Sequence, residues 1–393
     1  MTSNIPLSPV EYIFTGVCSQ PITLAFYYPE KIDDTILKAH LDTISEQFSP
    51  LRSKLKSVSG TNLELEITHD EIPFEVSKSS KKFDGNDPIT DYIEPVKTFE
   101  NEPLTRITIT HTPGRTGSVL AVSISHALVD GFSFFHFLSS WARATRNERY
   151  LPPHIPRDVF TPYLRNDVHN KIDQTQIVES AGLFLDSKRE PANTDLIRTE
   201  RRIIQNDLIQ KTIDEIKHSH DINVSKNDIV TALLWKEYLP RWTDAHDDDS
   251  VFITCPFDFR RVLSGFPKNY FGCALAFATA KTSLNQLKRS SIGDIAVLIK
   301  KAVNDMKEEH LQRSLTTLEN FRQQYGLEAT ERIHLRHPRN GMIVTNLSRM
   351  PLQELDFGSG SPESFIAYNE IEQSAAIFPH PDGLEVYVAH PLQ

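Results

Sequence analysis

Strand-like and helix-like segments alternate in both halves of the chain, and this alternation constrains the fold more than any other feature. Residues 22–29 are β-rich and end at a proline, while residues 31–48 carry apolar side chains at helical spacing. The second half repeats the pattern with a strand-like stretch at 250–259 and a helix-like stretch at 292–309. Strands and helices mixed in this way predict an α/β protein with mixed sheets.

A change in composition near the middle of the chain suggests where one lobe ends. Residues 150–200 are rich in Pro, Asn and Asp and lack long periodic runs. The 393 residues, 39% of them hydrophobic, suffice for two medium cores. We therefore predict two related lobes, residues 1–175 and 201–393, with a crossover linker at 176–200.

Charge and cysteine content narrow the class of protein. A formal net charge of -10 argues against nucleic acid or an anionic membrane surface as the main partner. Cys18, Cys255 and Cys273 lie far apart without a CxxC pair, so neither a disulfide framework nor a zinc ribbon is indicated, and we expect no metal. No basic-then-apolar leader and no window of 18 apolar residues is present. We expect a cytoplasmic monomer.

One histidine and one aspartate interrupt an apolar run at HALVDG, residues 126–131. The strand-like stretches 104–111 and 118–125 predict a hairpin that leads into it, and a helix is expected at 132–148. His126 at the strand end has a side chain that exchanges a proton near neutrality, which suits a general base. A hydrogen-bonded structural histidine is the alternative.

Asp130 and Gly131 follow His126 at the expected start of the helix. Asp130 is either a second catalytic group or the N-cap that holds the turn, and we favour the structural role.

Further motifs form a pattern with HALVDG. Residues 356–360 read DFGSG, and the pair resembles HxxxDG and DFGWG, the two signatures of the BAHD family of acyl-coenzyme A-dependent acyltransferases. Three more stretches resemble this family in the same order and extend the resemblance over residues 6–360: IPLSPVEYIF, SKNDIVTALLWK, and FDFRRVL followed by YFGC.

The resemblance implies two chloramphenicol-acetyltransferase-like domains with a tunnel at their interface, and an enzyme of secondary metabolism. Acyl-coenzyme A would be a co-substrate, with no permanently bound cofactor. His126 would deprotonate a small-molecule alcohol or amine, which attacks the thioester in a ternary complex. The residue types agree with a direct transfer that forms no acyl-enzyme. The sequence contains no GxSxG elbow and no cysteine with an evident catalytic partner that could serve as a nucleophile.

The resemblance also suggests a donor for the tetrahedral intermediate. Thr345 matches a position that lines the family's site, and loss of one such donor costs about 3 kcal/mol in the barrier. Asn346 and Ser348 are weaker candidates for this hydrogen-bond donor. A threonine chosen for its β propensity is the alternative for Thr345.

In the family, the aspartate of DFGWG lies away from the catalytic centre and pairs with an arginine. Here these residues would be Asp356 and Arg260, a scaffold pair, and Gly358 and Gly360 would share the scaffold role.

Two further positions have competing interpretations. Ser225 and Lys226 begin a helix near the family's nucleotide end, where amides and a lysine favour phosphate, but an exposed lysine there is often only solvated surface. His136 suggests a metal pair with His126, yet its apolar helix favours a hydrogen-bonded core histidine.

Several departures from the family pattern limit what can be transferred. Ser359 and Leu347 replace tryptophans of plant members, and Cys273 replaces the asparagine after Tyr-Phe-Gly. These changes weaken any transfer of plant acceptors and suggest a microbial branch. Two rival functions stay open: a carrier-protein-dependent condensation domain, in which Ser125 would be a histidine, and a catalytically silent small-molecule-binding member.

Overall fold

The chain forms two compact units in the computed structural model. The structure describes residues 4–16, 19–113, 117–165, 181–187, 189, 197–219, 222–368 and 371–391. Unit 1 comprises Met1–Pro162, Gly265–Ala274 and Pro351–Tyr368, and unit 2 comprises Tyr163–Ser264, Leu275–Met350 and Asn369–Gln393. Unlike the predicted lobes, the two units are not continuous in sequence, and the first stretch of unit 1 ends at Pro162. Residues 265–274 and 351–368, the latter with DFGSG, belong to unit 1.

Unit 1 is built on a five-stranded sheet of order β14-β2-β7-β6-β5 and a three-stranded sheet of order β1-β4-β3. Its elements are β1 (Asn4–Pro6), η1 (Glu11–Phe14), β2 (Ile22–Tyr28), α1 (Asp34–Gln47), η2 (Ser49–Arg52), β3 (Ser53–Ser59), β4 (Asn62–Ile67), β5 (Phe74–Lys78), η3 (Ile89–Asp91), β6 (Thr105–His111), β7 (Ser118–Ile124), α2 (Gly131–Thr145), η6 (Leu352–Glu354) and β14 (Ser364–Ala367). Helix η4 (Arg157–Tyr163) ends at the boundary with unit 2.

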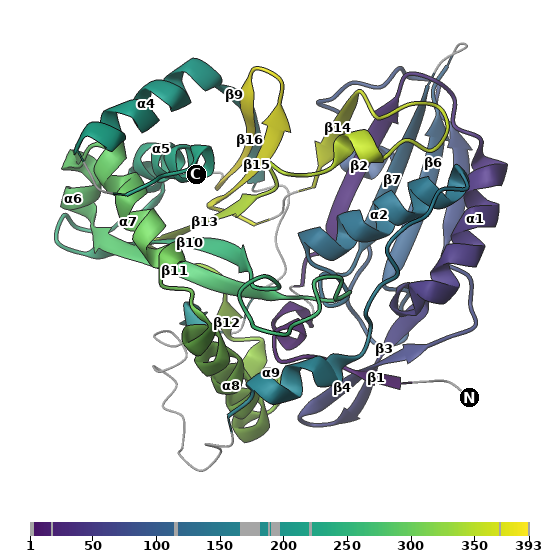
Figure 1. The fold of residues 1–393 in the computed structure, drawn as a ribbon, viewed down its shortest axis with the longest axis horizontal. Helices are drawn as coiled ribbons and strands as arrows, with labels where there is room; N and C mark the ends of the chain where they lie inside the picture. Colours follow the sequence, from purple (N-terminus) through teal and green to yellow (C-terminus); the bar gives the residue numbers. More distant parts are fainter. Residues whose placement is uncertain are drawn as a thin grey trace. The chain divides into compact units, whose positions relative to one another are not determined.

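Strand β7 is the central strand of the five-stranded sheet. All seven of its residues are buried, and it pairs antiparallel with β6 and β2. The predicted hairpin of β6 and β7 is thus confirmed. Helix α2 lies across one face of the sheet beside α1 (Figure 1), and the indole N–H of Trp141 on α2 donates to the Leu37 carbonyl at 3.1 Å.

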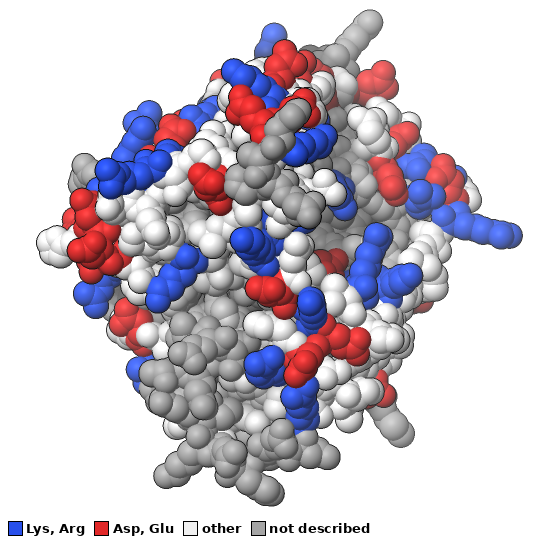
Figure 2. Space-filling model, turned by 60° about the vertical axis from the view of Figure 1, so that its left-hand side comes forward, with Lys and Arg blue, Asp and Glu red and all other residues white. Residues whose placement is uncertain are grey.

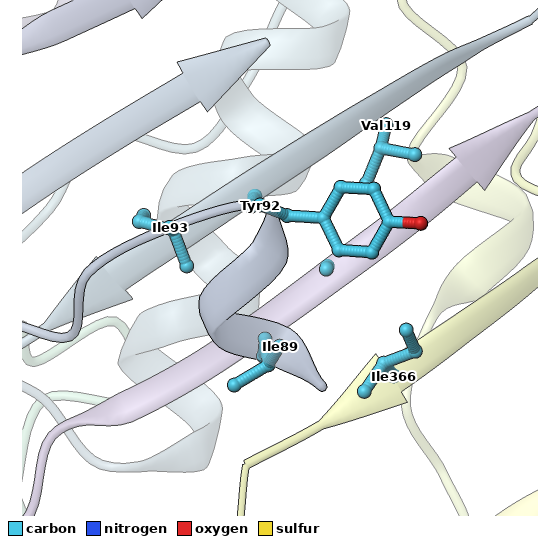
Figure 3. Close-up of a cluster of buried hydrophobic side chains, with 7 residues drawn as sticks. Ile89, Tyr92, Ile93, Val119 and Ile366 are labelled. Carbon is cyan, nitrogen blue, oxygen red and sulfur yellow. The ribbon is translucent and has the colours of Figure 1, made fainter. Parts of the chain in front are cut away.

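The late segment 351–368 joins unit 1 through backbone pairing and apolar packing. Strand β14 pairs antiparallel with β2, with Phe365 opposite Phe26. Ile366 of β14 packs in a buried cluster with Val119 and Tyr92 (Figure 3). The pairing of β14 with β2 was not predicted from the sequence, because an edge pairing between distant segments leaves no local signal.

Unit 2 is built on a six-stranded mixed sheet of order β11-β10-β13-β15-β16-β9 and a two-stranded sheet, β12-β8. Its elements are β8 (Phe184–Leu185), β9 (Ile197–Gln205), α4 (Asn206–Ser219), α5 (Lys226–Trp242), β10 (Ser250–Asp258), β11 (Leu275–Ser283), α6 (Leu284–Arg289), α7 (Ile292–Asn304), α8 (Glu308–Tyr325), α9 (Leu327–Thr330), β12 (Ile333–His334), β13 (Gly341–Asn346), β15 (Ser374–His380) and β16 (Gly383–Pro391). Helices α4, α5 and α7 gather on one side of the six-stranded sheet (Figure 1).

The surface carries mixed charge. Figure 2 shows acidic and basic side chains interspersed on one face, so the excess of negative charge is not gathered there. In the described part of the chain, every helix is too short or too polar to cross a bilayer. Most of the predicted linker, residues 176–180 and 190–196 with residue 188, lies outside the described residues.

Candidate active site

His126 lies in a tightly held turn between β7 and α2. The turn begins at Ser125, whose N–H donates to the Leu104 carbonyl at 2.8 Å and whose hydroxyl bonds that of Thr98 at 2.7 Å. The Ser125 carbonyl accepts from Leu128 at 2.9 Å. These bonds fix the backbone that presents the imidazole.

The side chains of Phe14 and Cys273 in unit 1 lie close to the imidazole of His126. The Phe14 ring stacks on it with centroids 4.0 Å apart and an interplanar angle of 7°. The Cys273 sulfur lies 3.6 Å from Nδ1. Burial lowers the pKa of His126 below its ordinary 6.5, against smaller opposing effects of a hydrogen bond to its own backbone and the Asp130 charge. A pKa below 6.5 favours the neutral ring at pH 7, which is the form a general base requires.

Asp130 organises the backbone on both sides of the turn. One carboxylate oxygen accepts from the Ser133 N–H at 2.9 Å and caps α2, which confirms the predicted N-cap. The other accepts from the Ala274 N–H at 2.9 Å. Gly131 is the first residue of α2. These contacts are those of a structural residue.

Residues 270–274, which we call the 270–274 strap, lie against this turn. The Gly272 N–H donates to the Ser133 hydroxyl at 3.1 Å, and that hydroxyl donates to the Gly272 carbonyl at 2.9 Å. The Cys273 N–H donates to a Glu11 carboxylate oxygen at 3.2 Å. The strap thus connects the start of α2 to Glu11.

Glu11 belongs to a buried ion pair that the sequence analysis missed. Its carboxylate lies 2.9 Å from the Arg157 guanidinium, and the two side chains are 0% and 2% exposed. The Tyr270 hydroxyl donates to the same carboxylate at 3.1 Å. Removing one partner would leave a buried charge uncompensated. The signal available in the sequence was the LSPVE match, which contains Glu11.

The cysteines correct one expectation. The sequence showed none with an evident catalytic partner, yet Cys273 lies beside His126, a contact between residues 147 positions apart. Cys273 is 0% exposed, so its thiol is not open to solvent. Burial raises the pKa of Cys255 to about 12. Cys18 lies outside the described residues.

The DFGSG loop is held by its own aspartate and by contacts with distant residues of unit 1. One Asp356 oxygen accepts from the Gly358 and Gly360 N–H groups at 2.8 and 2.9 Å, and both glycines have positive φ, 101° and 87°. The Arg146 guanidinium donates to the Asp356 carbonyl. The Tyr28 hydroxyl donates to the Leu355 carbonyl at 2.8 Å.

The arginine that contacts Asp356 within unit 1 is thus Arg146, whereas the sequence analysis expected Arg260 as its partner. In unit 2, Arg260 is 2% exposed and lies 3.1 Å from the Asp258 carboxylate. The expected pair of Asp356 with Arg260 joins residues of different units and stays a prediction.

Thr345 lies near the end of β13, where it is half-buried and opposite Ala376 of β15. The Asn346 side chain accepts from the Ser348 N–H at 3.0 Å, so it is engaged locally. The oxyanion role of Thr345 stays a prediction.

Ser225 and Lys226 have structural contacts in unit 2. Ser225 caps α5 through a capping box with Asp228. The Lys226 ammonium donates to the Asn206 side chain at 2.7 Å on the surface. A role in binding phosphate stays a prediction.

His136 bonds the Leu151 carbonyl at 2.8 Å through Nε2 and packs edge-on against Phe48. The predicted hydrogen bond is present, although His136 is half-buried and not in the core. Among the described residues, His, Cys, Asp and Glu side chains nowhere gather in threes that could hold a metal ion.

The chain resembles known proteins over nearly its whole length. A family model described as the Transferase family matches residues 4–393. Anthranilate N-benzoyltransferase protein 1 of Dianthus caryophyllus is 24% identical over 373 residues, covering 85% of this chain and 76% of that protein. Shikimate O-hydroxycinnamoyltransferase of Nicotiana tabacum is 22% identical over 353 residues, covering 85% and 78%.

Solved structures show the same fold. TRI101 of F. graminearum, complexed with ethyl coenzyme A, matches with a TM-score of 0.80 at 15% identity, covering 100% of this chain and 95% of that one. The predicted mixed α/β class with two domains is confirmed by this likeness.

Proposed function

The chain belongs to the BAHD family of acyl-coenzyme A-dependent acyltransferases, and from this premise we propose that His126 is the general base of a direct transfer in a ternary complex. The acyl group moves from the coenzyme A thioester to the hydroxyl or amine of a small molecule. We expect the enzyme to act as a cytoplasmic monomer on free thioesters.

The proposed reaction has two proton transfers. His126 takes the proton of the acceptor O–H or N–H while the acceptor attacks the thioester carbonyl carbon. The tetrahedral intermediate then collapses, the C–S bond breaks, and the imidazolium returns the proton to the departing sulfur. The products are an ester or amide and free coenzyme A.

The placement of the His126 imidazole is the observation that carries this proposal. Its lowered pKa keeps it unprotonated at pH 7, and the turn around Ser125 fixes its backbone. Its Nδ1 edge faces Cys273. This arrangement favours Nε2 as the nitrogen that takes the proton.

Other residues have assisting roles in the proposal. Thr345 donates a hydrogen bond to the oxyanion. Ser225 and Lys226 attract coenzyme A phosphate at the start of α5. Asp356, Arg260, Gly358 and Gly360 maintain the scaffold, as do Asp130 and Gly131 at the turn.

The test is release of free thiol from a panel of acyl-coenzyme A donors and alcohol or amine acceptors. Purified protein should release thiol with a matching pair, and His126→Ala should abolish release while its melting temperature stays near that of the parent. His136→Gln, a histidine substitution in the same unit, is the matched control and should retain activity. Full activity of His126→Ala would contradict the mechanism. Turnover only with carrier-bound acyl groups would favour a condensation-type enzyme.

A further inference from the structure

Unit 2 contains a cavity of about 580 Å³ at the start of strands β10 and β13. Small-molecule sites in proteins usually measure about 300–1,000 Å³. We propose that this cavity is a second binding site, whose ligand is a small aromatic carboxylate: a planar ring that carries one negative charge. The lining residues that argue for this ligand, all of them in unit 2, are Phe184, Asp186, Phe252, His337, Arg339 and Asn340.

The cavity is separate from the residues of unit 2 that are proposed to act in acyl transfer. Asn340, which lines the cavity, directly precedes β13, whereas Thr345 lies near the other end of that strand. Because a strand rises about 3.3 Å per residue, the backbones of Asn340 and Thr345 lie about 16 Å apart. Ser225 and Lys226 are not among the lining residues either. The proposal therefore does not depend on the proposed function.

Three rings form the aromatic part of the cavity. Phe252 and His337 stack with their centroids 4.8 Å apart and an interplanar angle of 6°. Phe184 meets both rings edge-on, with centroid distances of 5.2 and 5.3 Å. Phe252 and His337 are only half-buried, so part of each ring is accessible to a ligand. A planar aromatic ligand packs favourably against such a group, face to face or edge to face.

Hydrogen bonds hold the turn that carries His337. The Arg336 guanidinium donates to the carbonyls of His337 and Pro338 at 3.2 and 2.7 Å. The Asn340 N–H donates to Nδ1 of His337 at 3.0 Å, and the Asn340 side chain donates to the Ser250 carbonyl at 3.3 Å. The rings therefore need little reorganisation to receive a ligand, which lowers the entropic cost of binding.

His337 supplies a hydrogen-bond donor at the cavity. Its Nδ1 accepts from Asn340, so the neutral ring carries its proton on Nε2. Burial lowers the pKa of His337 below its ordinary 6.5, and the charge of Arg339 lowers it further, against the opposing charge of Asp186. Within the part of the chain that the structure describes, no side chain or carbonyl accepts from this Nε2. A carboxylate oxygen is a suitable acceptor for it.

The charges at the cavity favour a ligand with one negative charge. Arg339 is exposed on the lining, and the Lys281 ammonium lies 5.7 Å from the centroid of the Phe252 ring. Neither cation forms an ion pair with a described residue. Asp186, whose carboxylate accepts from the Ser187 N–H at 2.8 Å, is the acid of the lining. Two cations and one anion leave a single positive charge, which matches a carboxylate better than the several charges of a nucleotide.

The forked guanidinium of Arg339 suits the same ligand. A guanidinium binds a carboxylate through two parallel N–H donors, which fixes the orientation of the group as well as its position. With the carboxylate on Arg339 and the ring against Phe252 and His337, both parts of the ligand have a partner in the cavity.

The first test is binding of 2-naphthoate to the full chain, measured by isothermal titration calorimetry. Two matched probes separate the ring from the charge: 2-naphthamide has the same ring without the charge, and cyclohexanecarboxylate has the charge without the aromatic ring. We expect 2-naphthoate to bind at least about tenfold more tightly than either probe. A smaller difference from either probe, or no binding of 2-naphthoate, would overturn the proposal.

The second test locates the bound 2-naphthoate. Arg339→Gln and Phe252→Leu should each raise its Kd about tenfold, because they remove the charged partner and the aromatic partner. Lys301→Gln, which removes an exposed cation of α7 outside the cavity lining, is the matched control and should leave Kd unchanged. Since Arg339 is exposed, its variant should keep the melting temperature of the parent even if Phe252→Leu does not. An unchanged Kd in Arg339→Gln, or in a folded Phe252→Leu, would place 2-naphthoate elsewhere and overturn the proposal.

Failure of this proposal is distinguishable from failure of the proposed function. Binding of 2-naphthoate without thiol release from any donor and acceptor pair would support the cavity site and contradict the acyltransferase mechanism. Thiol release without binding of 2-naphthoate would leave the mechanism standing and overturn the cavity site.

Discussion

HALVDG and DFGSG in unit 1 both contain an aspartate followed by glycine, yet the two aspartates accept hydrogen bonds from different parts of the chain. Asp130 accepts from Ser133 and from Ala274, residues 3 and 144 positions away. Asp356 accepts from Gly358 and Gly360, 2 and 4 positions away.

Two motifs that are similar in sequence thus form hydrogen bonds over very different sequence separations. The HALVDG aspartate connects segments that are distant in sequence, and its charge acts on the half-buried imidazole of His126. The DFGSG aspartate closes a local loop whose glycines supply the backbone conformation. We therefore expect chemistry to depend on the first loop, and local stability to depend on the second.

Substitutions in HALVDG and in DFGSG should differ most in their effect on kcat. We expect His126→Ala to lower kcat about 10³-fold, the scale of a lost general base. Asp356→Ala should retain kcat within about tenfold, since the family places this residue in the scaffold. Steady-state kinetics on both variants, with circular dichroism to verify folding, measures the contrast. Equal losses would show that the two loops share one function.

The second-largest difference should be in the unfolding free energy that each aspartate contributes. Asp130→Ala removes a helix cap and leaves the buried Ala274 N–H without this acceptor, so we expect a loss of about 2–4 kcal/mol in unfolding free energy. Asp356→Ala affects a more exposed loop and should cost about 1 kcal/mol. Urea denaturation compares them, and a larger loss for Asp356→Ala would reverse our interpretation.

Gly358 tests whether backbone conformation explains the DFGSG loop. Its φ is 101° and an added Cβ would meet nothing within 4 Å, so Gly358→Ala should cost about 1–2 kcal/mol through strain alone. Gly60 has equally open surroundings without a positive φ and serves as the matched control. Equal melting temperatures of the two variants would rule out strain as the reason for glycine.

The pH dependence should give the smallest contrast. His126 must be neutral to accept a proton, so kcat/KM should fall only as pH drops below its lowered pKa, on the acid side of 6.5. Asp130 raises that pKa, and Asp130→Asn should therefore move the acid limb to lower pH. Asp356→Asn should leave the limb in place. A limb that moves to higher pH in Asp130→Asn would contradict the sign of this effect.

Local patterns predicted much of the secondary structure and part of the site. The hairpin of β6 and β7, helix α2 and its cap Asp130 follow from periodicity and capping rules within about 40 residues. Helix α8 was missed although Leu311, Leu315 and Leu318 recur at helical spacing and are buried in it.

The contacts that surround His126 were not predictable in the same way. Phe14, Cys273 and His126 come from three distant segments, and one sequence carries no signal of their proximity. The family resemblance supplied the base itself. It did not supply Cys273, because this position departs from the family pattern.

The pairing of β14 with β2 has a consequence for biosynthesis. Strand β2 gains its neighbour on one side only when residues 364–367 have left the ribosome, so unit 1 cannot complete its sheet during most of translation. Until then, the edge of β2 and the apolar residues that Ile366 covers remain open to other chains. Non-local pairing of this kind slows folding, and the nascent chain should depend on chaperones more than its size alone suggests.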